Sequence, residues 1–263
     1  EIGRVLVAGE FNPLTAGREL AIGVPFHDLD NLDQAGAVIL VSDITGAVFD
    51  AIYTQATTGV PGVEEELDRF GEVLAAGDFD GDGIDELAVG DPIEDLSGPF
   101  VGDVGSLTVL DFDGDGHVQW LQDDLNPESS ETGDHFAAAL AAADFDGDGI
   151  DDLAVGAPDE TLGPVGQAGL LHVLYGEAGG GLGNSRDQIW LQTLDPSEDA
   201  DHFSAALAAG HFSRHTGADL AIGSPGETIG GLVATGAVNV LFSQALLVDG
   251  FESGDMSSWQ PPV

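Results

Sequence analysis

The stretch DFDGDGIDDLAVGAP, residues 144–158, joins an acidic turn directly to a short apolar strand that ends in Gly-x-Pro. Nearly the same text, DFDGDGIDELAVGDP, occupies residues 78–92, and weaker copies occupy residues 10–25 and 211–225. A hydrophobic residue followed by a small one opens each copy, at Ile2, Phe70, Phe136 and Phe203. Self-similarity at a near-constant period is the signature of repeat architectures. The chain is therefore predicted to consist of four repeats.

The acidic turn has the ligand pattern of a cation-binding loop. Its carboxylates alternate at Asp144, Asp146 and Asp148, and a glycine at the sixth position permits the sharp bend that turns them inward. Further oxygens are expected from the backbone carbonyl of Ile150 and the carboxylate of Asp152. An all-oxygen ligand set suits a hard cation, and Ca²⁺ is its natural occupant. The upstream copy predicts a second calcium loop from Asp78, Asp80, Asp82, the Ile84 carbonyl and Glu86.

Two other interpretations of these loops were weighed. An EF-hand needs a bidentate Glu at the twelfth position, where this chain has Val89 or Val155 inside an apolar strand. A solvated turn that binds nothing is the simpler alternative, because Asp and Gly are common turn residues. However, three carboxylates forced together repel one another, and the pattern recurs at the same place in two repeats. Calcium binding is therefore favoured.

Three similar stretches are not assigned a metal. The turn at residues 10–19 has lost its alternating carboxylates. In the fourth repeat, the ligand positions are occupied by His211, Ser213, His215 and Asp219. Two imidazoles would suit a softer metal such as zinc. A loop that has lost its metal ligands and is held by hydrogen bonds is favoured instead. The stretch DFDGDG at residues 111–116 lies elsewhere in its repeat and is interpreted as a hairpin turn.

The pattern Phe-Gly, Asp-x-Asp-x-Asp-Gly-x-x-Asp and Leu-Ala-Val-Gly-Ala-Pro resembles the FG-GAP repeats of integrin α-subunit β-propellers and of many secreted bacterial proteins. The resemblance covers residues 2–243 and is most specific in the second and third repeats. It implies an all-β fold, a β-propeller-type array of four four-stranded blades, closed or part of a larger ring. It also implies calcium between the first two strands of a blade and an extracellular role in binding or adhesion.

The predicted units follow the repeats. They are a first blade at residues 2–68 with a degenerate loop, a second at 69–135 and a third at 136–202 with calcium loops, a fourth at 203–247 with a degenerate loop, and a C-terminal tail at 248–263. Residues 137–143, AAALAAA, have high helix propensity, but their counterparts in the other repeats place them in the innermost blade strand, where only small side chains fit. The Gly-rich residues 176–183 are interpreted as a flexible loop.

Composition restricts the class of partner. The 263 residues include 48 acidic and only 5 basic ones, which gives a net charge of −43, and there is no cysteine. Nucleic acid is not an expected partner, because phosphate contacts need Lys and Arg clusters. No apolar run is long enough for membrane insertion. Repulsion among the many negative charges is expected to require cations or salt, which fits a secreted or cell-surface protein. Glu1 in place of a starting Met suggests a processed chain.

No catalytic pattern is recognised, and the chain is not expected to be an enzyme. Ser224 lies in Gly-Ser-Pro-Gly rather than in a nucleophile elbow, and the clustered Asp residues are better explained as metal ligands than as glycosidase carboxylates. The expected function is that of an extracellular calcium-binding repeat protein for adhesion, binding or self-assembly, with a protein, a surface glycan or itself as partner. An enzyme or accessory domain of a secreted hydrolase and a glycan-binding module are the alternatives.

Overall fold

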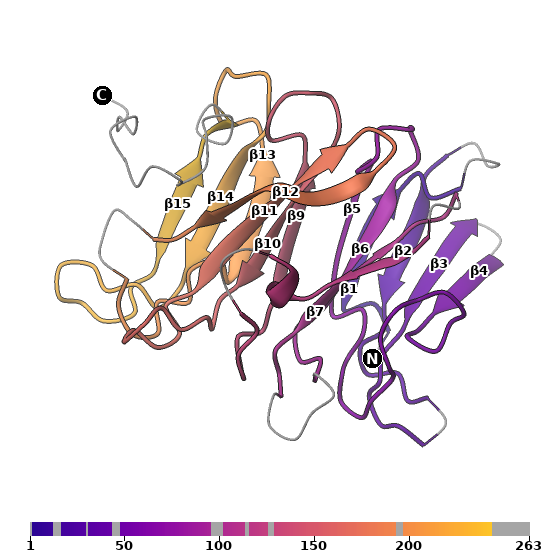
Figure 1. Cartoon of the computed structure of the whole chain (residues 1–263), viewed down its shortest axis with the longest axis horizontal. Coiled ribbons are helices and arrows are strands. Elements are labelled where there is room, and N and C mark those ends of the chain that lie inside the picture. Colours follow the sequence, from indigo (N-terminus) through magenta and orange to yellow (C-terminus); the bar gives the residue numbers. More distant parts are fainter. Residues whose placement is uncertain are drawn as a thin grey trace.

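The computed structural model describes residues 2–12, 17–29, 31–43, 48–95, 102–113, 116–125, 129–192 and 197–243. These residues form an all-β structure of four antiparallel sheets, three with four strands and the last with three (Figure 1). A short 3-10 turn, η1 (Gln122–Asp124), is the one helical element named in the described part of the chain. The predicted C-terminal tail and the fourth strand sought at residues 245–248 lie outside the described residues.

Each sheet uses consecutive strands in chain order. The first sheet contains β1 (Val5–Gly9), β2 (Glu19–Gly23), β3 (Val38–Asp43) and β4 (Val48–Tyr53), and the second contains β5 (Val73–Gly77), β6 (Glu86–Asp91), β7 (Ser106–Leu110) and β8 (Val118–Trp120). The third contains β9 (Ala139–Ala143), β10 (Asp152–Ala157), β11 (Leu170–Glu177) and β12 (Gly181–Trp190), and the fourth contains β13 (Ala206–Gly210), β14 (Asp219–Ser224) and β15 (Ala237–Leu241). The repeat boundaries themselves stay a prediction.

The alanine-rich stretch at residues 137–143 is a strand, as its repeat counterparts predicted. Residues 139–143 form β9, the innermost strand of the third sheet, and pair with β10 from Ala139↔Gly156 to Ala143↔Asp152. The innermost strands β1, β5, β9 and β13 lie side by side in this order. Local helix propensity is overridden here because the neighbouring sheets leave room only for small side chains.

Consecutive sheets approach closely where the second strand of one repeat meets the start of the next. A Cβ added to Gly90 would lie 2.4 Å from the backbone oxygen of Ala137, and one added to Gly156 would lie 2.5 Å from that of Ser204. Both distances are far below van der Waals contact. This close approach explains why Gly is the next-to-last residue of the apolar strand in the second and third repeats and why a small residue follows Phe136 and Phe203.

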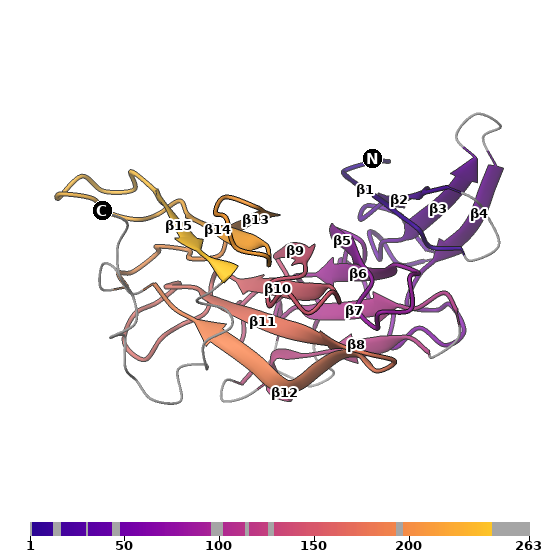
Figure 2. The ribbon, with the colours of Figure 1, turned by 90° about the horizontal axis from the view of Figure 1, so that it is seen from above.

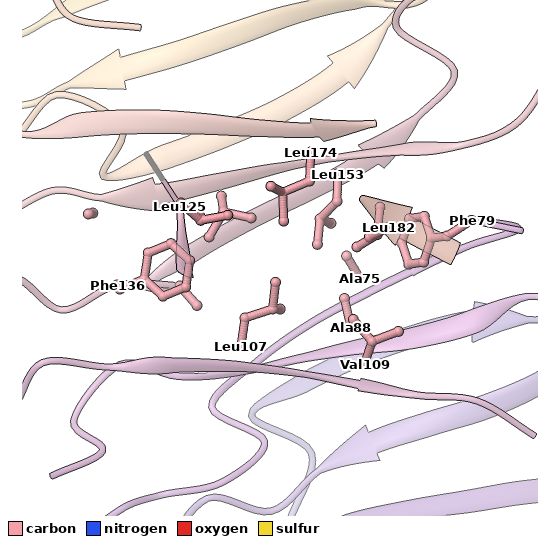
Figure 3. Close-up of a cluster of buried hydrophobic side chains, with 13 residues drawn as sticks. Ala75, Phe79, Ala88, Leu107, Val109, Leu125, Phe136, Leu153, Leu174 and Leu182 are labelled. Carbon is pink, nitrogen blue, oxygen red and sulfur yellow. The ribbon is translucent and has the colours of Figure 1, made fainter. Parts of the chain in front are cut away.

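The core lies between the sheets rather than within one of them. Figure 3 shows the side chains of Leu107 and Val109 from the second sheet and of Leu153 and Leu174 from the third, gathered in one buried layer with Phe79. Comparable clusters join the first sheet to the second and the third to the fourth. Each junction is therefore an apolar sheet-on-sheet interface, which holds the repeats in sequence order.

The four sheets form an open arc. The first sheet and the fourth lie at opposite ends of the molecule in both views (Figures 1 and 2), with the second and third between them. The described residues therefore do not close into a ring. No helix in the described residues is long and apolar enough to cross a membrane.

The interpretation of residues 176–183 as a flexible loop was wrong. β11 extends to Glu177 and β12 begins at Gly181, so most of this stretch is paired strand around a tight turn. The turn also rests on the second repeat, where Gly179 N–H donates to the backbone oxygen of Asp80 at 2.7 Å. Glycine content misled the prediction, because these glycines permit a close approach between backbones: a Cβ on Gly176 would lie 2.4 Å from the Asp151 oxygen.

Candidate metal centres

The loop between β9 and β10 brings three of its predicted ligands together. One carboxylate oxygen from each of Asp144, Asp146 and Asp152 lies within 4.8 Å of the others. Asp144 also shapes the turn, because its Oδ2 accepts the N–H of Gly149 at 3.0 Å. Gly149 itself has a φ of 95°, a left-handed conformation that a residue with a Cβ rarely adopts. The glycine at the sixth position thus produces the bend that the sequence predicted.

The loop between β5 and β6 has the same arrangement. Asp78, Asp80 and Glu86 form an equivalent group within 4.8 Å, and Gly83 N–H donates to Asp78 Oδ2 at 3.0 Å. The other oxygen of Asp78, Oδ1, is buried and has no hydrogen-bond partner. An orphaned anionic oxygen beside two further carboxylates fits a hard cation such as Ca²⁺, because it gains a partner when the cation binds.

Not every predicted ligand lies in these two groups. Asp82 forms a separate group with Asp80 and Asp113, and Asp148 belongs to none of the acidic groups found among the described residues. Asp113 comes from the stretch that was interpreted as a hairpin turn, which the structure places against the second-repeat loop; residues 114–115 of that stretch lie outside the described part. Ligation by the Ile84 and Ile150 carbonyls stays a prediction.

The carboxylate at the last loop position has a structural role in all four repeats. Asp152 Oδ2 accepts the N–H of Phe145 at 2.8 Å, and its Oδ1 accepts that of Gly176 at 3.0 Å. Glu19, Glu86 and Asp219 likewise accept loop N–H groups, from Phe11, Phe79 and Ser213. This explains why an acidic residue persists in the first and fourth loops, whose other acidic positions have changed.

Each loop is also bonded to the loop of the preceding repeat. Asp151 N–H donates to the Asp78 backbone oxygen at 2.9 Å, and Asp78 N–H donates to Asp151 Oδ2 at 3.2 Å. Asp85 and Glu10 make the same reciprocal pair at 2.8 and 2.9 Å. A cation that fixes a loop would therefore also stiffen the junction between two sheets.

Burial and mutual repulsion disfavour the charged forms of these carboxyls. Burial raises the pKa of Glu86 to about 8; the Phe79 N–H opposes this shift, and Asp80 and Asp78 add to it. Burial also raises the pKa of Asp152 to about 7 against its backbone hydrogen bonds. A divalent cation favours the ionised form of a carboxyl. Cation binding and deprotonation are therefore expected to be coupled in both loops.

Comparison with known proteins finds a family match in the two repeats that contain these loops. The family model for the FG-GAP repeat matches residues 70–105 and 136–174. The chain carries two FG-GAP repeats. Both matched spans contain a predicted calcium loop. No curated protein matches the sequence. Among solved structures, the rhamnogalacturonan lyase PL11 of Bacillus licheniformis aligns with 82% of this chain at 13% identity and a TM-score of 0.46, and the chain spans 38% of that lyase.

One basic residue at the second of these FG-GAP loops was missed by the sequence analysis. Arg186 of β12 reaches across to Asp146, with Nη1 to Oδ2 at 3.1 Å, and its guanidinium lies 5.1 Å from the ring centroid of Tyr175. The pairing joins residues 40 positions apart, and no local sequence motif predicts it. The β11–β12 hairpin, which takes the place of the flexible loop expected at residues 176–183, brings them together.

A second polar group links the segments that precede Phe136 and Phe203. Asp159 accepts from His135 Nδ1 and His202 Nδ1, each at 2.6 Å, so that one carboxylate links two histidines that precede Phe136 and Phe203. Burial acts to raise the pKa of Asp159, but the two histidines outweigh it and lower that pKa. The hydrogen bond that His135 donates to Asp159 raises the pKa of His135. The sequence analysis did not single out these histidines, because their contact depends on sheet packing.

We expect Asp159→Asn to lower the pKa of His135, because the substitution removes the anionic hydrogen-bond acceptor while burial of the imidazole remains. The pKa should fall from above the ordinary value of about 6.5 to that value or below it. An NMR titration of the histidine ring signals measures the shift, and His27, which is remote in sequence from Asp159, is the internal control. A His135 titration that does not change would contradict the contact.

Proposed function

We propose that this chain is an extracellular, calcium-stiffened FG-GAP module of the β-propeller type that binds further copies of itself through its terminal sheets, and that it is not an enzyme. The observation that carries this proposal is that, within the described residues, each terminal sheet has an apolar face without a neighbouring sheet. In the proposed assembly, a second copy of the chain provides that neighbouring sheet.

The first sheet has a row of aliphatic side chains on its outer face. Leu6, Ile22, Ile39 and Ile52 are direct cross-strand neighbours through the registers of β1 to β4. Leu6 is 57% exposed and Ile52 is 55% exposed. In the second sheet the corresponding row begins with Leu74 and Val89, and both are buried against the first sheet. The outer face of the first sheet thus has the composition of an interface without its partner.

The fourth sheet has the complementary feature. Its outer face contains Val238, which is 71% exposed, and Phe212, at the second position of its loop, is 54% exposed. The residues at that loop position in the other repeats, Phe11, Phe79 and Phe145, are buried in the junction with the next sheet. Phe212 has no such junction among the described residues.

The internal junctions supply the template for association. At each one, a face of the kind exposed on the fourth sheet packs against a face of the kind exposed on the first sheet. When the first sheet of one copy docks on the fourth sheet of another copy, the two copies make this same contact head to tail. Heterologous contacts of this kind give rings when the rotation closes and filaments when it does not.

Calcium and salt are expected to promote this association. The net charge of −43 makes copies repel one another, and salt or bound cations weaken that repulsion. Calcium in the two predicted loops would also fix the sheets against which the terminal sheets pack. Extracellular calcium modules bind the ion with dissociation constants of about 0.1 to 1 mM, so calcium at such concentrations is expected to be effective.

Light scattering across a range of protein and salt concentrations, with calcium and with chelator, tests the proposal. We expect oligomers in calcium that Ile52→Lys or Phe212→Lys converts to monomers, because a lysine cannot be buried in an apolar sheet interface without a partner. Val63→Lys is the matched control, because Val63 is 66% exposed but lies outside both faces. A wild-type chain that remains monomeric throughout would rule out a second copy as the partner.

A further inference from the structure

Three buried carboxyl groups meet at the junction between the first and second sheets. Asp68, Asp91 and Glu94 are 2%, 0% and 6% exposed, and one oxygen of each lies within 4.8 Å of the others. Asp68 precedes β5, and Asp91 ends β6. Because these strands are antiparallel, the group lies at the opposite end of the sheet from the loop at residues 78–86. It is therefore separate from both predicted calcium loops.

The three carboxyls differ in their hydrogen-bond partners. Asp68 Oδ2 accepts the N–H of Glu65 at 2.5 Å, and Glu94 Oε2 accepts Gln55 Nε2 at 2.6 Å. Among the described residues, neither oxygen of Asp91 has a hydrogen bond of standard geometry; the polar groups that influence this completely buried carboxyl include the Glu94 carboxyl and the Ile93 N–H. A buried carboxylate without a partner is strongly destabilising unless it is protonated or coordinates a cation.

The neighbouring charges do not compensate this group. The charged groups with the largest influence on Asp68 and Asp91 are themselves acidic, among them Glu65 and Glu94. Arg69, which follows Asp68 in the chain, interacts elsewhere: its guanidinium lies over the Phe26 ring at 5.3 Å and 3.7 Å from Glu72.

The following junctions contain the same arrangement without its third carboxyl. Gln122 Nε2 donates to Glu160 Oε2 at 2.6 Å, and Gln192 donates to Glu227 in the same way. Asp134 and Asp201 take the place of Asp68 in these repeats. However, the position of Asp91 is occupied by Ala157 and Ser224. Asp91 is thus an addition to a repeated Gln–Glu–Asp arrangement, and it is the residue with two unpartnered oxygens.

We infer that Asp68, Asp91 and Glu94 bind a hard divalent cation, which joins the first sheet to the second. Carboxylate oxygens are the ligands that Ca²⁺, Mg²⁺ and Mn²⁺ prefer. A divalent cation supplies the positive charge that the chain does not provide here, and it gives both oxygens of Asp91 a potential partner. This site is structural, because it lies inside a sheet junction, and it does not depend on calcium binding in the FG-GAP loops.

Thermal melts of the full chain distinguish a cation site from protonated carboxyls. At pH 8 in chelator, Asp91→Ala is expected to melt several degrees above the wild type, because it removes a buried unpartnered carboxyl and matches the natural Ala157. In saturating Ca²⁺, Mg²⁺ or Mn²⁺, each tested alone, this advantage should disappear for the cation that binds, because only the wild type gains binding free energy at this site.

Metal content after desalting provides a second measurement. The wild type is expected to retain one more equivalent of the effective cation than Asp91→Ala does. Asp134→Asn is the matched control, because it changes the same arrangement at a junction without a third carboxyl, and it should retain as much cation as the wild type. Equal metal content in wild type and Asp91→Ala, together with an unchanged melting difference in every cation, would overturn the inference and leave a proton-sharing group.

Discussion

Replacing Asp152 with Ala should destabilise the protein by about 3 to 5 kcal/mol even without calcium. The side chain is 1% exposed and accepts the backbone N–H groups of Phe145, Asp146 and Gly176. Leaving a buried donor unsatisfied costs about 1 to 3 kcal/mol, and hydrogen bonds to a charged acceptor are the stronger ones. Denaturant unfolding in chelator measures this loss. The same measurement in calcium should show that the stabilisation expected from calcium binding at the third-repeat loop is lost as well.

Asp146→Ala is the matched comparison for this prediction. Asp146 belongs to the same acidic group but carries less of the loop's backbone hydrogen bonding, and its side chain, which is 9% exposed, pairs with the 49% exposed side chain of Arg186. In chelator its substitution should cost less stability than that of Asp152, because an ion pair with a solvent-exposed arginine contributes only about 1 kcal/mol or less. In calcium it should lower the melting temperature relative to wild type. Equal losses for the two variants in chelator would contradict the division between a structural carboxylate and a metal ligand.

Stability without calcium should fall as the pH rises from about 5 to about 8. Burial raises the pKa of Asp134 to about 6, of Asp152 to about 7 and of Glu86 to about 8. The unfolded values lie near 4, so the folded state holds protons that the unfolded chain has released. Stability is then fully present below the unfolded pKa and is lost as the pH rises through each folded pKa. Asp152 alone, at about 1.4 kcal/mol per pH unit between pH 5 and its pKa of about 7, contributes about 3 kcal/mol, so the expected loss is at least that large.

Thermal melts at fixed ionic strength test this dependence. A loss of about 3 kcal/mol corresponds to a decrease in melting temperature of about 6 to 12 °C for a chain of this size. Saturating calcium should flatten the dependence, because a cation favours the ionised carboxyls of both loops. Glu86→Gln should flatten it in part without calcium, because the amide does not titrate. A melting temperature that rises with pH in chelator would refute the assignment of protonated carboxyls.

Local patterns predicted the loops well, because alternating Asp residues and a glycine at the sixth position have strong geometric consequences within nine residues. Repeat comparison then corrected the one stretch in which local propensity pointed to a helix, residues 137–143. The features that were missed all arise from contacts between residues that are far apart in the sequence. The pairing of Arg186 with Asp146, the two histidines on Asp159 and the buried Asp91 depend on sheet packing that no short window of sequence contains.

The hydrogen bonds between successive loops imply a graded response to loss of the ion. The paired bonds of Asp151 with Asp78 join the second and third repeats, but Ala218 stands at the matching position of the fourth and donates only its backbone N–H to Asp144. Because solenoid-like arrays unfold repeat by repeat according to their nearest-neighbour coupling, the fourth sheet should fray before the central pair separates. In an environment of fluctuating salinity, the fourth sheet would unfold and refold reversibly while the middle of the molecule stayed folded.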